Sequence, residues 1–262
     1  TALSSIRMSD ISTIDVSVIL PCYNEAKILR SSVSTVQAVM NQTRYRYEII
    51  IAEDASRDGT DTIAKMLSEE FPNVIWIHRE ERRGRGSAVA NAIMQSRGDI
   101  CGYLDTDLET PAHYIPAFVS AIENGADIAS ADRVYRMNFW ERCVRAHKVL
   151  AHAVYAMLSR VALRVPLRDI ESGFKFFRRA RILPILAQIK DMHWFWDTEV
   201  MVRPYYAGYA VKEIPVVFTP DPTHESKVDL MKDSVDHLRQ LLAFRREIRQ
   251  TYWRGVKPPV KL

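Results

Sequence analysis

Residues 100–109 read ICGYLDTDLE and join a short apolar run directly to a group of acids. The run from 100 to 104 has the composition of a buried strand, and Asp105 and Asp107 follow where it ends. Alternate residues of an extended chain point to the same side, so the two carboxylates are held close together. Like charges held close destabilise a fold unless a cation relieves them. The stretch therefore predicts a buried strand that ends in a divalent-metal site.

Three earlier runs share this apolar character, at residues 16–20 (VSVIL), 47–52 (YEIIIA) and 74–77 (VIWI). Segments with the apolar spacing of helices separate them. Strands that alternate with helices in this way indicate a mostly parallel sheet joined by right-handed crossovers. The expected fold class is therefore α/β, with a Rossmann-like central sheet flanked by helices in a single catalytic domain.

The loops that follow these strands are expected to lie together, because ligands of open α/β sheets bind outside the carboxyl ends of the strands. The four loop segments are PCYNEA (21–26), EDASRDGT (53–60), RRGRGS (82–87) and DTDLE (105–109). Taken singly, Glu25, Asp58 and Asp61 are explained equally well as acids in the first turns of helices. The pair Asp105 and Asp107 is not, which makes it the stronger functional signal.

The composition excludes several classes of protein. A chain of 262 residues with 47% hydrophobic residues can bury a full core and is too apolar to be disordered. The 36 Lys and Arg residues against 32 Asp and Glu give a net charge of +4, which gives no reason to expect a nucleic-acid partner. The three scattered cysteines form neither a disulfide framework nor a metal-binding spacing, which favours a reducing compartment. No apolar run reaches the ~18 to 20 residues of a membrane-spanning helix.

The loop segments, in this order, resemble those of the family-2 glycosyltransferases, which have the GT-A fold. VSVILPCYNEA is similar to the family's opening strand and nucleotide loop, EDASRDGT to its second acidic turn, RRGRGSAVANAI to its basic glycine loop and LDTDLETP to its DxD segment. Further on, DIESGFK (169–175), WDTE (196–199) and GYAVKEIP (208–215) resemble the later part of the family's dolichyl- and polyprenyl-phosphate mannosyl- and glucosyltransferases. The resemblance covers roughly residues 15–228, and several motifs in the correct order are specific evidence.

The resemblance implies a nucleotide-diphosphate sugar donor and a metal ion, Mg²⁺ or Mn²⁺. Asp105, Asp107 and Glu109 are the implied ligands, with Glu109 where relatives usually have Gln, and Asp107 is also counted as catalytic. Carboxylate oxygens suit both ions. The implied nucleotide-binding residues are Pro21, Tyr23, Glu25, Asp54, Arg85 and Asp105. Asp54 would bond the base, whereas Arg85 is explained equally well as a phosphate contact or a solvated loop arginine.

The second half of the chain is expected to hold the acceptor. In the synthases that the chain resembles, two arginines neutralise the acceptor phosphate, and Arg133 matches the first position better than Arg145 matches the second. A surface charge explains Arg145 equally well. The other implied acceptor-binding residues are Ser172, Lys175 and Lys227. A departure from the pattern is Asp221, which stands where mannosyl synthases often carry arginine, so the acceptor clamp is expected to be built differently or to be of the glucosyl type.

The acceptor decides whether a general base is needed. A lipid phosphate is already anionic and can attack the anomeric carbon without losing a proton, whereas a sugar hydroxyl needs a carboxylate to accept its proton. Asp197 and Glu199 are the candidates for that base. The resemblance favours an inverting, metal-dependent transfer of mannose or glucose from GDP- or UDP-sugar to dolichyl or polyprenyl phosphate. The alternatives are a transferase acting on a hydroxyl acceptor and a binding protein without turnover, although intact acids oppose the latter.

The expected layout is an N-terminal extension (1–14), a GT-A domain (15–220) with a nucleotide-sugar half (15–110) and an acceptor half (111–220), and a C-terminal amphipathic basic helix and tail (221–262). Apolar residues recur at helical spacing in that last part, and five arginines accompany them: Arg239, Arg245, Arg246, Arg249 and Arg254. Such a helix suits peripheral contact with an anionic membrane, or packs on the domain with solvated arginines outside. The expected location is the cytoplasm, at the cytoplasmic face of a membrane.

Overall fold

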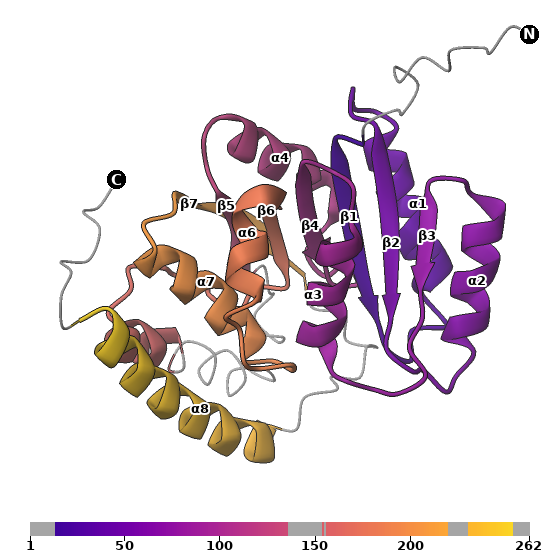
Figure 1. The fold of residues 1–262 in the computed structure, drawn as a ribbon. Coiled ribbons are helices and arrows are strands. Elements are labelled where there is room, and N and C mark those ends of the chain that lie inside the picture. The colour runs from indigo at the N-terminus through magenta and orange to yellow at the C-terminus, as the bar shows by residue number, and fades with distance from the viewer. Residues whose placement is uncertain (1–13, 136–153, 155, 220–229, 254–262) are drawn as a thin grey trace, which may run out of the picture.

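The computed structural model describes residues 14–135, 154, 156–219 and 230–253. Its first half contains four parallel strands, β1 (Val16–Cys22), β2 (Tyr47–Glu53), β3 (Val74–Ile77) and β4 (Ile100–Leu104), paired in the order β3-β2-β1-β4 (Figure 1). Each strand begins where its apolar run predicts. The side chains of β1, β2 and β4 are almost entirely buried because helices cover both faces of the sheet.

The second half extends the same sheet through β5 (Ile128–Tyr135), β6 (Phe174–Arg178) and β7 (Val211–Phe218). The full order is β3-β2-β1-β4-β6-β5-β7, with β6 antiparallel to both β4 and β5. The expected α/β class with a mostly parallel sheet is confirmed. Because β6 runs the other way, it begins beside the end of β4, and Phe174 pairs with Leu104. The SGF segment (172–174, within DIESGFK) therefore lies next to the DTD segment (105–107).

Two apolar cores lie on the two faces of the sheet. One face is covered by α1 (Leu29–Met40), α2 (Thr60–Glu70), the short helix η1 (Ala112–Tyr114) and α4 (Ile115–Glu123). The other is covered by α3 (Arg85–Gln95), α6 (Arg179–Leu186), α7 (Trp196–Tyr206) and α8 (Leu230–Thr251). Neighbouring residues of β1 alternate between the cores, with Ile19 on the α3 side and Val18 and Leu20 on the α1 side.

The C-terminal helix packs on the domain through one face. Leu241, Phe244 and Ile248 are buried in the same core as α7, and the ring of Phe244 contacts that of Phe195 edge-on. Two ion pairs secure the contact, from Lys190 and Arg203 to Glu247. Within the described residues, every helix is too short or too polar to cross a bilayer.

Gly102 in β4 makes the join between the two halves of the sheet possible. It pairs with Phe176 of β6, and a Cβ atom at position 102 would lie 2.3 Å from the Phe176 ring. The aromatic ring therefore occupies the space that any other residue at position 102 would need. This close approach fits β6 against β4 in the middle of the sheet.

We expect Gly102→Ala to lower the free energy of unfolding by about 1–3 kcal/mol, because overpacking a buried site forces neighbours out of their preferred geometry. Urea denaturation measures the change. The exposed substitution Thr62→Ala serves as the control and should change stability by less than about 0.5 kcal/mol. If steric overlap is the cause, the penalty shrinks in a Phe176→Leu background; an undiminished penalty would contradict the explanation.

Candidate active site

The DTD segment and the SGF segment meet at the edge of the sheet where β4 ends and β6 begins. The Asp105 amide donates to the carbonyl of Gly173, with a nitrogen–oxygen distance of 3.1 Å. A Cβ atom at position 173 would lie 1.7 Å from Oδ2 of Asp105. The glycine of the SGF segment is therefore the residue that leaves room for the first carboxylate of the DTD segment.

Arg85, the first residue of α3, joins this edge to α7. Its Nε and Nη2 donate to Oδ1 of Asp105 at 3.1 and 2.6 Å, and its Nη1 donates to Oδ2 of Asp197 at 2.7 Å. The Arg85 side chain is only 13% exposed. It is therefore a fixed bridge between two carboxylates and not a solvated loop arginine. Whether it also meets a phosphate remains a prediction.

Asp197 lies at the centre of a buried polar cluster. Besides Arg85, its donors are Nζ of Lys175 at 2.8 Å and the hydroxyl of Tyr103. Burial alone would raise the pKa of Asp197, but the positive charges of Lys175 and Arg85 outweigh it and hold that pKa below its usual value. Burial also lowers the pKa of Lys175, whose Nζ additionally donates to the carbonyl of Ser172. We call Asp197, Lys175, Arg85 and Tyr103 the central cluster.

Asp107 has the opposite electrostatic environment. Burial and the charges of Asp105, Glu109 and Glu25 raise its pKa to about 7. Its Oδ1 accepts a hydrogen bond from the Glu109 amide at 3.2 Å. The three other acids therefore lie close enough to Asp107 to oppose its ionisation.

This donor set fits a divalent metal ion in its chemistry, because mutual repulsion among hard oxygen ligands is what a cation relieves. Within the described ranges, no group of three or more His, Cys, Asp or Glu residues is arranged to hold a metal by itself. Mg²⁺ at such sites takes one or two carboxylates and completes its shell with water and substrate phosphate. The acidic edge could therefore supply one or two carboxylate ligands to such an ion.

The loops after β1 and β2 are tied together by side chains of the second loop. The amides of Asn24, Glu25 and Ala26 donate to Ser56 Oγ, Thr60 Oγ1 and Asp58 Oδ2, at 2.9, 2.8 and 3.0 Å. In return, the Arg57 amide donates to Oδ1 of Asn24 at 2.8 Å. Asp58 and Thr60 therefore shape the first loop, in agreement with a structural explanation for Asp58.

Asp54 performs a similar task for the basic loop. It is buried at the end of β2, and its two carboxylate oxygens accept from the amides of Arg83 and Gly84 at 3.0 and 2.8 Å. Gly84 has φ +100°, and a Cβ atom there would overlap His193, so the tight turn requires glycine. Asp54 thus sets the start of α3, and its predicted contact with a base is still a prediction.

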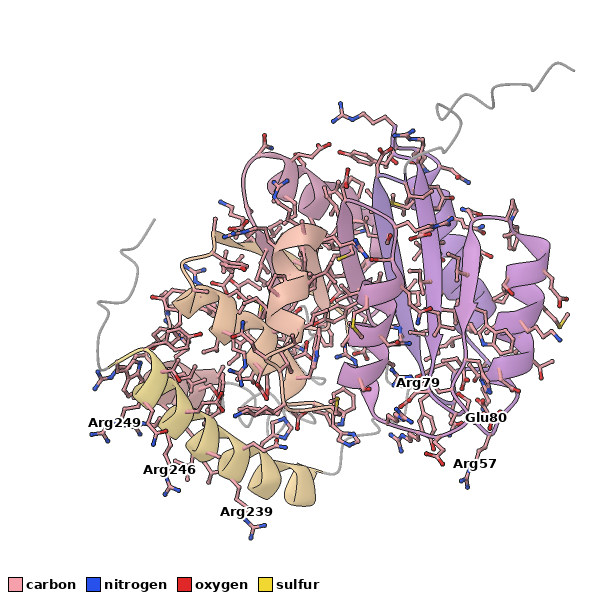
Figure 2. The ribbon with its side chains drawn as sticks, viewed as in Figure 1. Arg57, Arg79, Glu80, Arg239, Arg246 and Arg249 are labelled. Carbon is pink, nitrogen blue, oxygen red and sulfur yellow. The ribbon has the colours of Figure 1, made fainter. Side chains whose placement is uncertain are left out.

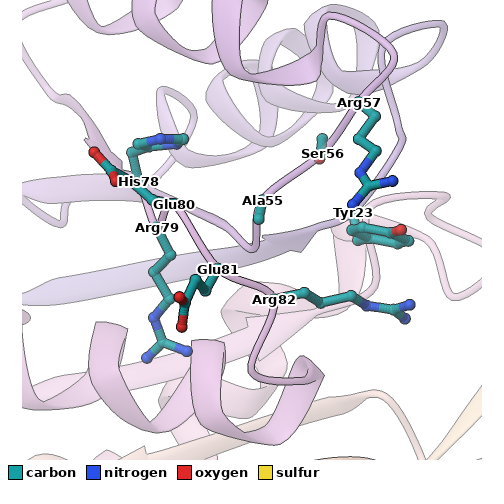
Figure 3. Close-up of a pocket in the computed structure, with 9 residues that line it drawn as sticks. All are labelled: Tyr23, Ala55, Ser56, Arg57, His78, Arg79, Glu80, Glu81 and Arg82. Carbon is teal, nitrogen blue, oxygen red and sulfur yellow. The ribbon is translucent and has the colours of Figure 1, made fainter.

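A cavity of about 730 Å³ opens beside these loops, with Tyr23, Ala55, Ser56 and residues 78–82 among its lining (Figure 3). The side chains of Arg57 and Arg82 both extend toward Tyr23, and the Arg82 guanidinium lies 3.8 Å from the centre of its ring. His78 Nδ1 is 2.6 Å from Oε2 of the buried Glu53. The cavity combines an aromatic face with cations, which suits a planar, anionic ligand.

On the acceptor side, Arg133 is largely buried and makes a bidentate pair with Asp169, at 2.6 and 2.9 Å. Glu171 lies close by: burial, then Asp197 and Asp169, raise its pKa to about 7 against the opposing charges of Arg133 and Lys175. Ser172 is buried and accepts from the Phe174 amide. Two other predicted acceptor residues, Arg145 and Lys227, lie outside the described residues.

Glu199 is not brought to the central cluster. Its carboxylate accepts from Nε of Arg203 at 2.8 Å and from the amides of Lys190 and Asp191 at 3.3 and 3.0 Å. Glu199 and Asp197 are two residues apart on α7, which turns their side chains to nearly opposite sides of the helix. Glu199 therefore links α7 to the loop before it and does not lie beside Asp107.

A scan against family models matches residues 17–184 to Glycosyl transferase family 2. The chain belongs to this family. Two relatives from archaea are AglD, a glycosyltransferase of Haloferax volcanii, 35% identical over 253 residues, and a dolichol-phosphate mannosyltransferase of Pyrococcus furiosus, 29% identical over 238 residues. The matches cover 94% and 89% of this chain but only 38% and 65% of those two relatives, so the chain spans less than two thirds of either protein.

A dolichyl-phosphate β-glucosyltransferase of Dictyostelium discoideum is 25% identical over 254 residues, which is 90% of this chain and 75% of the relative. Among solved structures, the UDP complex of glucosyl-3-phosphoglycerate synthase from Mycobacterium tuberculosis superposes with a TM-score of 0.67 at 18% identity, covering 89% of this chain and 80% of that one. Another complex of that synthase contains Mn²⁺, UDP and glucosyl-3-phosphoglycerate, with a TM-score of 0.60. At these identities the structural match shows the shared fold.

Sequence reasoning missed three residues of this site. Tyr103 is inside the β4 run, where its hydroxyl gives no signal among apolar neighbours, and Asp169 and Glu171 are quoted only as parts of a motif. The one available signal is chemical. A buried lysine or arginine needs a carboxylate partner, so Lys175 and Arg133 imply acids nearby.

We expect Asp107→Asn to stabilise the metal-free protein at about pH 8 but not at about pH 4. The raised pKa means that the folded state binds the Asp107 proton more tightly than the unfolded chain does. The stability of the native protein therefore falls as pH rises from the ordinary aspartate value of 3.8 to about 7. The Asn variant lacks this contribution, so its melting temperature, measured in EDTA, should exceed the native value increasingly across that window. A constant difference between the two proteins would refute the assigned environment.

Proposed function

We propose that this chain is a metal-dependent, inverting glycosyltransferase that transfers mannose or glucose from a GDP- or UDP-sugar to dolichyl or another polyprenyl phosphate. Membership of family 2 supports glycosyl transfer. The names of the Pyrococcus and Dictyostelium relatives support a hexose and a dolichyl phosphate acceptor. The protein would act as a peripheral protein at the cytoplasmic face of a membrane.

The acidic edge supports the donor half of the proposal. Asp107, with one of its neighbours Asp105 and Glu109, would hold Mg²⁺ or Mn²⁺, which acts on the departing diphosphate as a Lewis acid when bound. In the metal-free protein, burial and the neighbouring acids oppose the charge of Asp107 and raise its pKa to about 7. The nucleotide would occupy the cavity beside Tyr23, with Pro21, Glu25 and Asp54 in the adjoining loops.

Arg85 would serve the leaving group. It is the cation that reaches Asp105 from the basic loop, and its charge is held in place by Asp197. A guanidinium fixed in advance needs no reorganisation as negative charge develops on a diphosphate, which is the condition for effective electrostatic stabilisation. In this role Lys175 and Tyr103 are positioning residues that hold Asp197.

The ion pairs of Asp197 and Glu199, the two candidate bases, are the observation that supports a phosphate acceptor. Asp197 accepts from three donors and has a lowered pKa, so it takes a proton poorly near neutral pH. Glu199 is paired with Arg203 on the far side of α7. A phosphate acceptor needs neither residue as a base, and Arg133 and Lys175 would supply positive charge on the acceptor side.

One observation favours transfer to a hydroxyl acceptor as the second candidate. Glu171 has a pKa of about 7 and lies beside Arg133 in the acceptor half. A carboxylate with a pKa near the working pH is suited to accept a proton from a hydroxyl. Glu171 therefore replaces Asp197 and Glu199 as the base that such a reaction would use.

The test is to assay GDP-mannose, UDP-glucose and their exchanged-base counterparts against polyprenyl phosphate and against soluble sugar acceptors, with Mn²⁺, Mg²⁺ or EDTA. We expect metal-dependent transfer to the lipid phosphate with inversion, and Asp107→Asn to reduce it by at least about a hundredfold through loss of electrostatic stabilisation. Product anomers are read by NMR.

Glu171→Gln separates the two acceptors. If the acceptor is a phosphate, this variant keeps its turnover within about tenfold, whereas loss of a general base lowers turnover by about 10²–10⁴-fold. The control is Glu199→Gln, which removes a carboxylate outside the central cluster and should leave the reaction chemistry unchanged. Transfer only to a free hydroxyl, with a large loss in Glu171→Gln, would overturn the lipid-phosphate assignment.

A further inference from the structure

The outward face of α8 combines leucines with arginines. In residues 237–251 the buried side chains Leu241, Phe244 and Ile248 face the core. The exposed flank beside them carries Leu242, Arg245 and Arg249, whose spacings of three, four and seven residues align them in one stripe, and Arg246 lies farther round the helix, opposite the core. Figure 2 shows Arg246 and Arg249 pointing away from the body of the protein.

A second helix adds apolar surface next to α8. Residues 156–163 are helical, and Met157 and Val161 expose 68% and 69% of their surface one turn apart. Three contacts join this helix to the end of α8. The hydroxyl of Tyr206 donates to the Leu163 carbonyl at 2.5 Å, Trp253 Nε1 donates to the Tyr206 hydroxyl at 2.9 Å, and the Arg164 guanidinium lies 4.3 Å from the centre of the Trp253 ring.

The charge on this surface is one-sided. In residues 237–251 of α8 the single acid is Glu247, and it turns inward to Lys190 at 2.8 Å and Arg203 at 2.9 Å. The arginines on the outward side therefore have no compensating acid from this part of their own helix. We define the docking face as Met157, Val161, Leu242, Arg245, Arg246 and Arg249.

We propose that the docking face binds the surface of an anionic lipid bilayer. Exposed apolar side chains beside a row of cations match the two layers of such a surface, since arginines meet the headgroup phosphates while Met157 and Val161 reach the acyl boundary. A face without acids also opposes docking of a second copy of itself, because the arginines of the two copies would repel. An anionic bilayer satisfies both the charge and the apolar area.

The part of α8 that begins at His237 passes close to the acceptor side of the candidate active site. At the start of its described side chains, α8 places His237 Nε2 3.7 Å from Oε1 of Glu171 and its ring edge-on to Phe195. Figure 1 shows α8 running along the side of the molecule to which β1 and β2 point. Docking through α8 would therefore bring the strand ends, with Arg133 nearby, close to the headgroup layer. This deepens the proposed function, on which it rests only for the identity of the acceptor.

The test is co-sedimentation of the full chain with vesicles of phosphatidylcholine, with and without phosphatidylglycerol. We expect binding to the anionic vesicles, weakened by raised salt because the contacts are electrostatic. Each arginine near an anionic surface contributes roughly fivefold, so the triple variant Arg245→Glu, Arg246→Glu, Arg249→Glu should bind at least about a hundredfold more weakly. All three side chains are exposed, and circular dichroism verifies that the variant is folded.

The matched control reverses three exposed cations on other elements, Arg44, Lys65 and Lys212, and so changes the net charge by the same amount. This control variant should keep most of the vesicle binding, because the position of the positive charges matters more than the net charge of the protein. The double variant Met157→Ser, Val161→Ser tests the apolar half and should reduce binding about tenfold or more through lost acyl burial.

Several outcomes overturn the inference. One is that the α8 triple variant binds vesicles as tightly as the native chain. Another is that the α8 and control triple variants lose the same amount of vesicle binding. The third is that binding is the same with and without phosphatidylglycerol. Sedimentation equilibrium showing a dimer that Leu242→Asp dissociates, with vesicle binding unchanged, would assign the face to a second copy.

Failure of the docking face and failure of the proposed function give different results. With a short-chain, water-soluble polyprenyl phosphate and no membrane, the α8 triple variant should transfer sugar at the native rate. Loss of transfer in that assay would contradict a role confined to membrane binding. Vesicle binding by a chain that transfers sugar to no lipid phosphate would refute the proposed function and leave the docking face standing.

Discussion

The carboxylate of Asp197 is the constraint on which the arrangement of the site depends. It takes charge-bearing donors from β6 and α3 and a hydroxyl from β4, so one buried acid connects three elements to α7. A buried lysine and arginine would destabilise the fold if either lacked its partner, since an uncompensated buried charge costs several kcal/mol. The cluster therefore fixes the Arg85 side chain between Asp197 and Asp105, at the start of α3 that Asp54 sets.

The sheet was predictable from the sequence where the apolar pattern is continuous. The four parallel strands of the first half follow from runs such as VSVIL, because burial on both faces favours apolar residues at nearly every position. The direction of β6 did not follow, since FKFFR is compatible with a strand of either direction. Direction is set by connections and by close approaches such as that of Gly102 to Phe176, which depend on two segments distant in sequence.

The sequence predicted which loops form the site, but not which side chains pair with each other there. The ends of β1, β2 and β4 gather the acids because parallel strands place their carboxyl ends together. By contrast, the sequence treats Asp197 and Glu199 alike, and only the turn of α7 separates the one that meets Lys175 from the one that meets Arg203. Arg85 likewise looks like any loop arginine until its two carboxylate partners are placed.

The exchange of hydrogen bonds between the loops after β1 and β2 has a consequence for ligand recognition. Because three consecutive amides of the first loop, at residues 24–26, end on side chains of the second, neither loop can change shape alone. A ligand that enters beside Tyr23 meets a surface that is already ordered, so little of its binding free energy is spent on freezing the backbone. The same coupling means that a substitution that reshapes PCYNEA also disturbs EDASRDGT, so a change of ligand preference made in one loop is transmitted to the other.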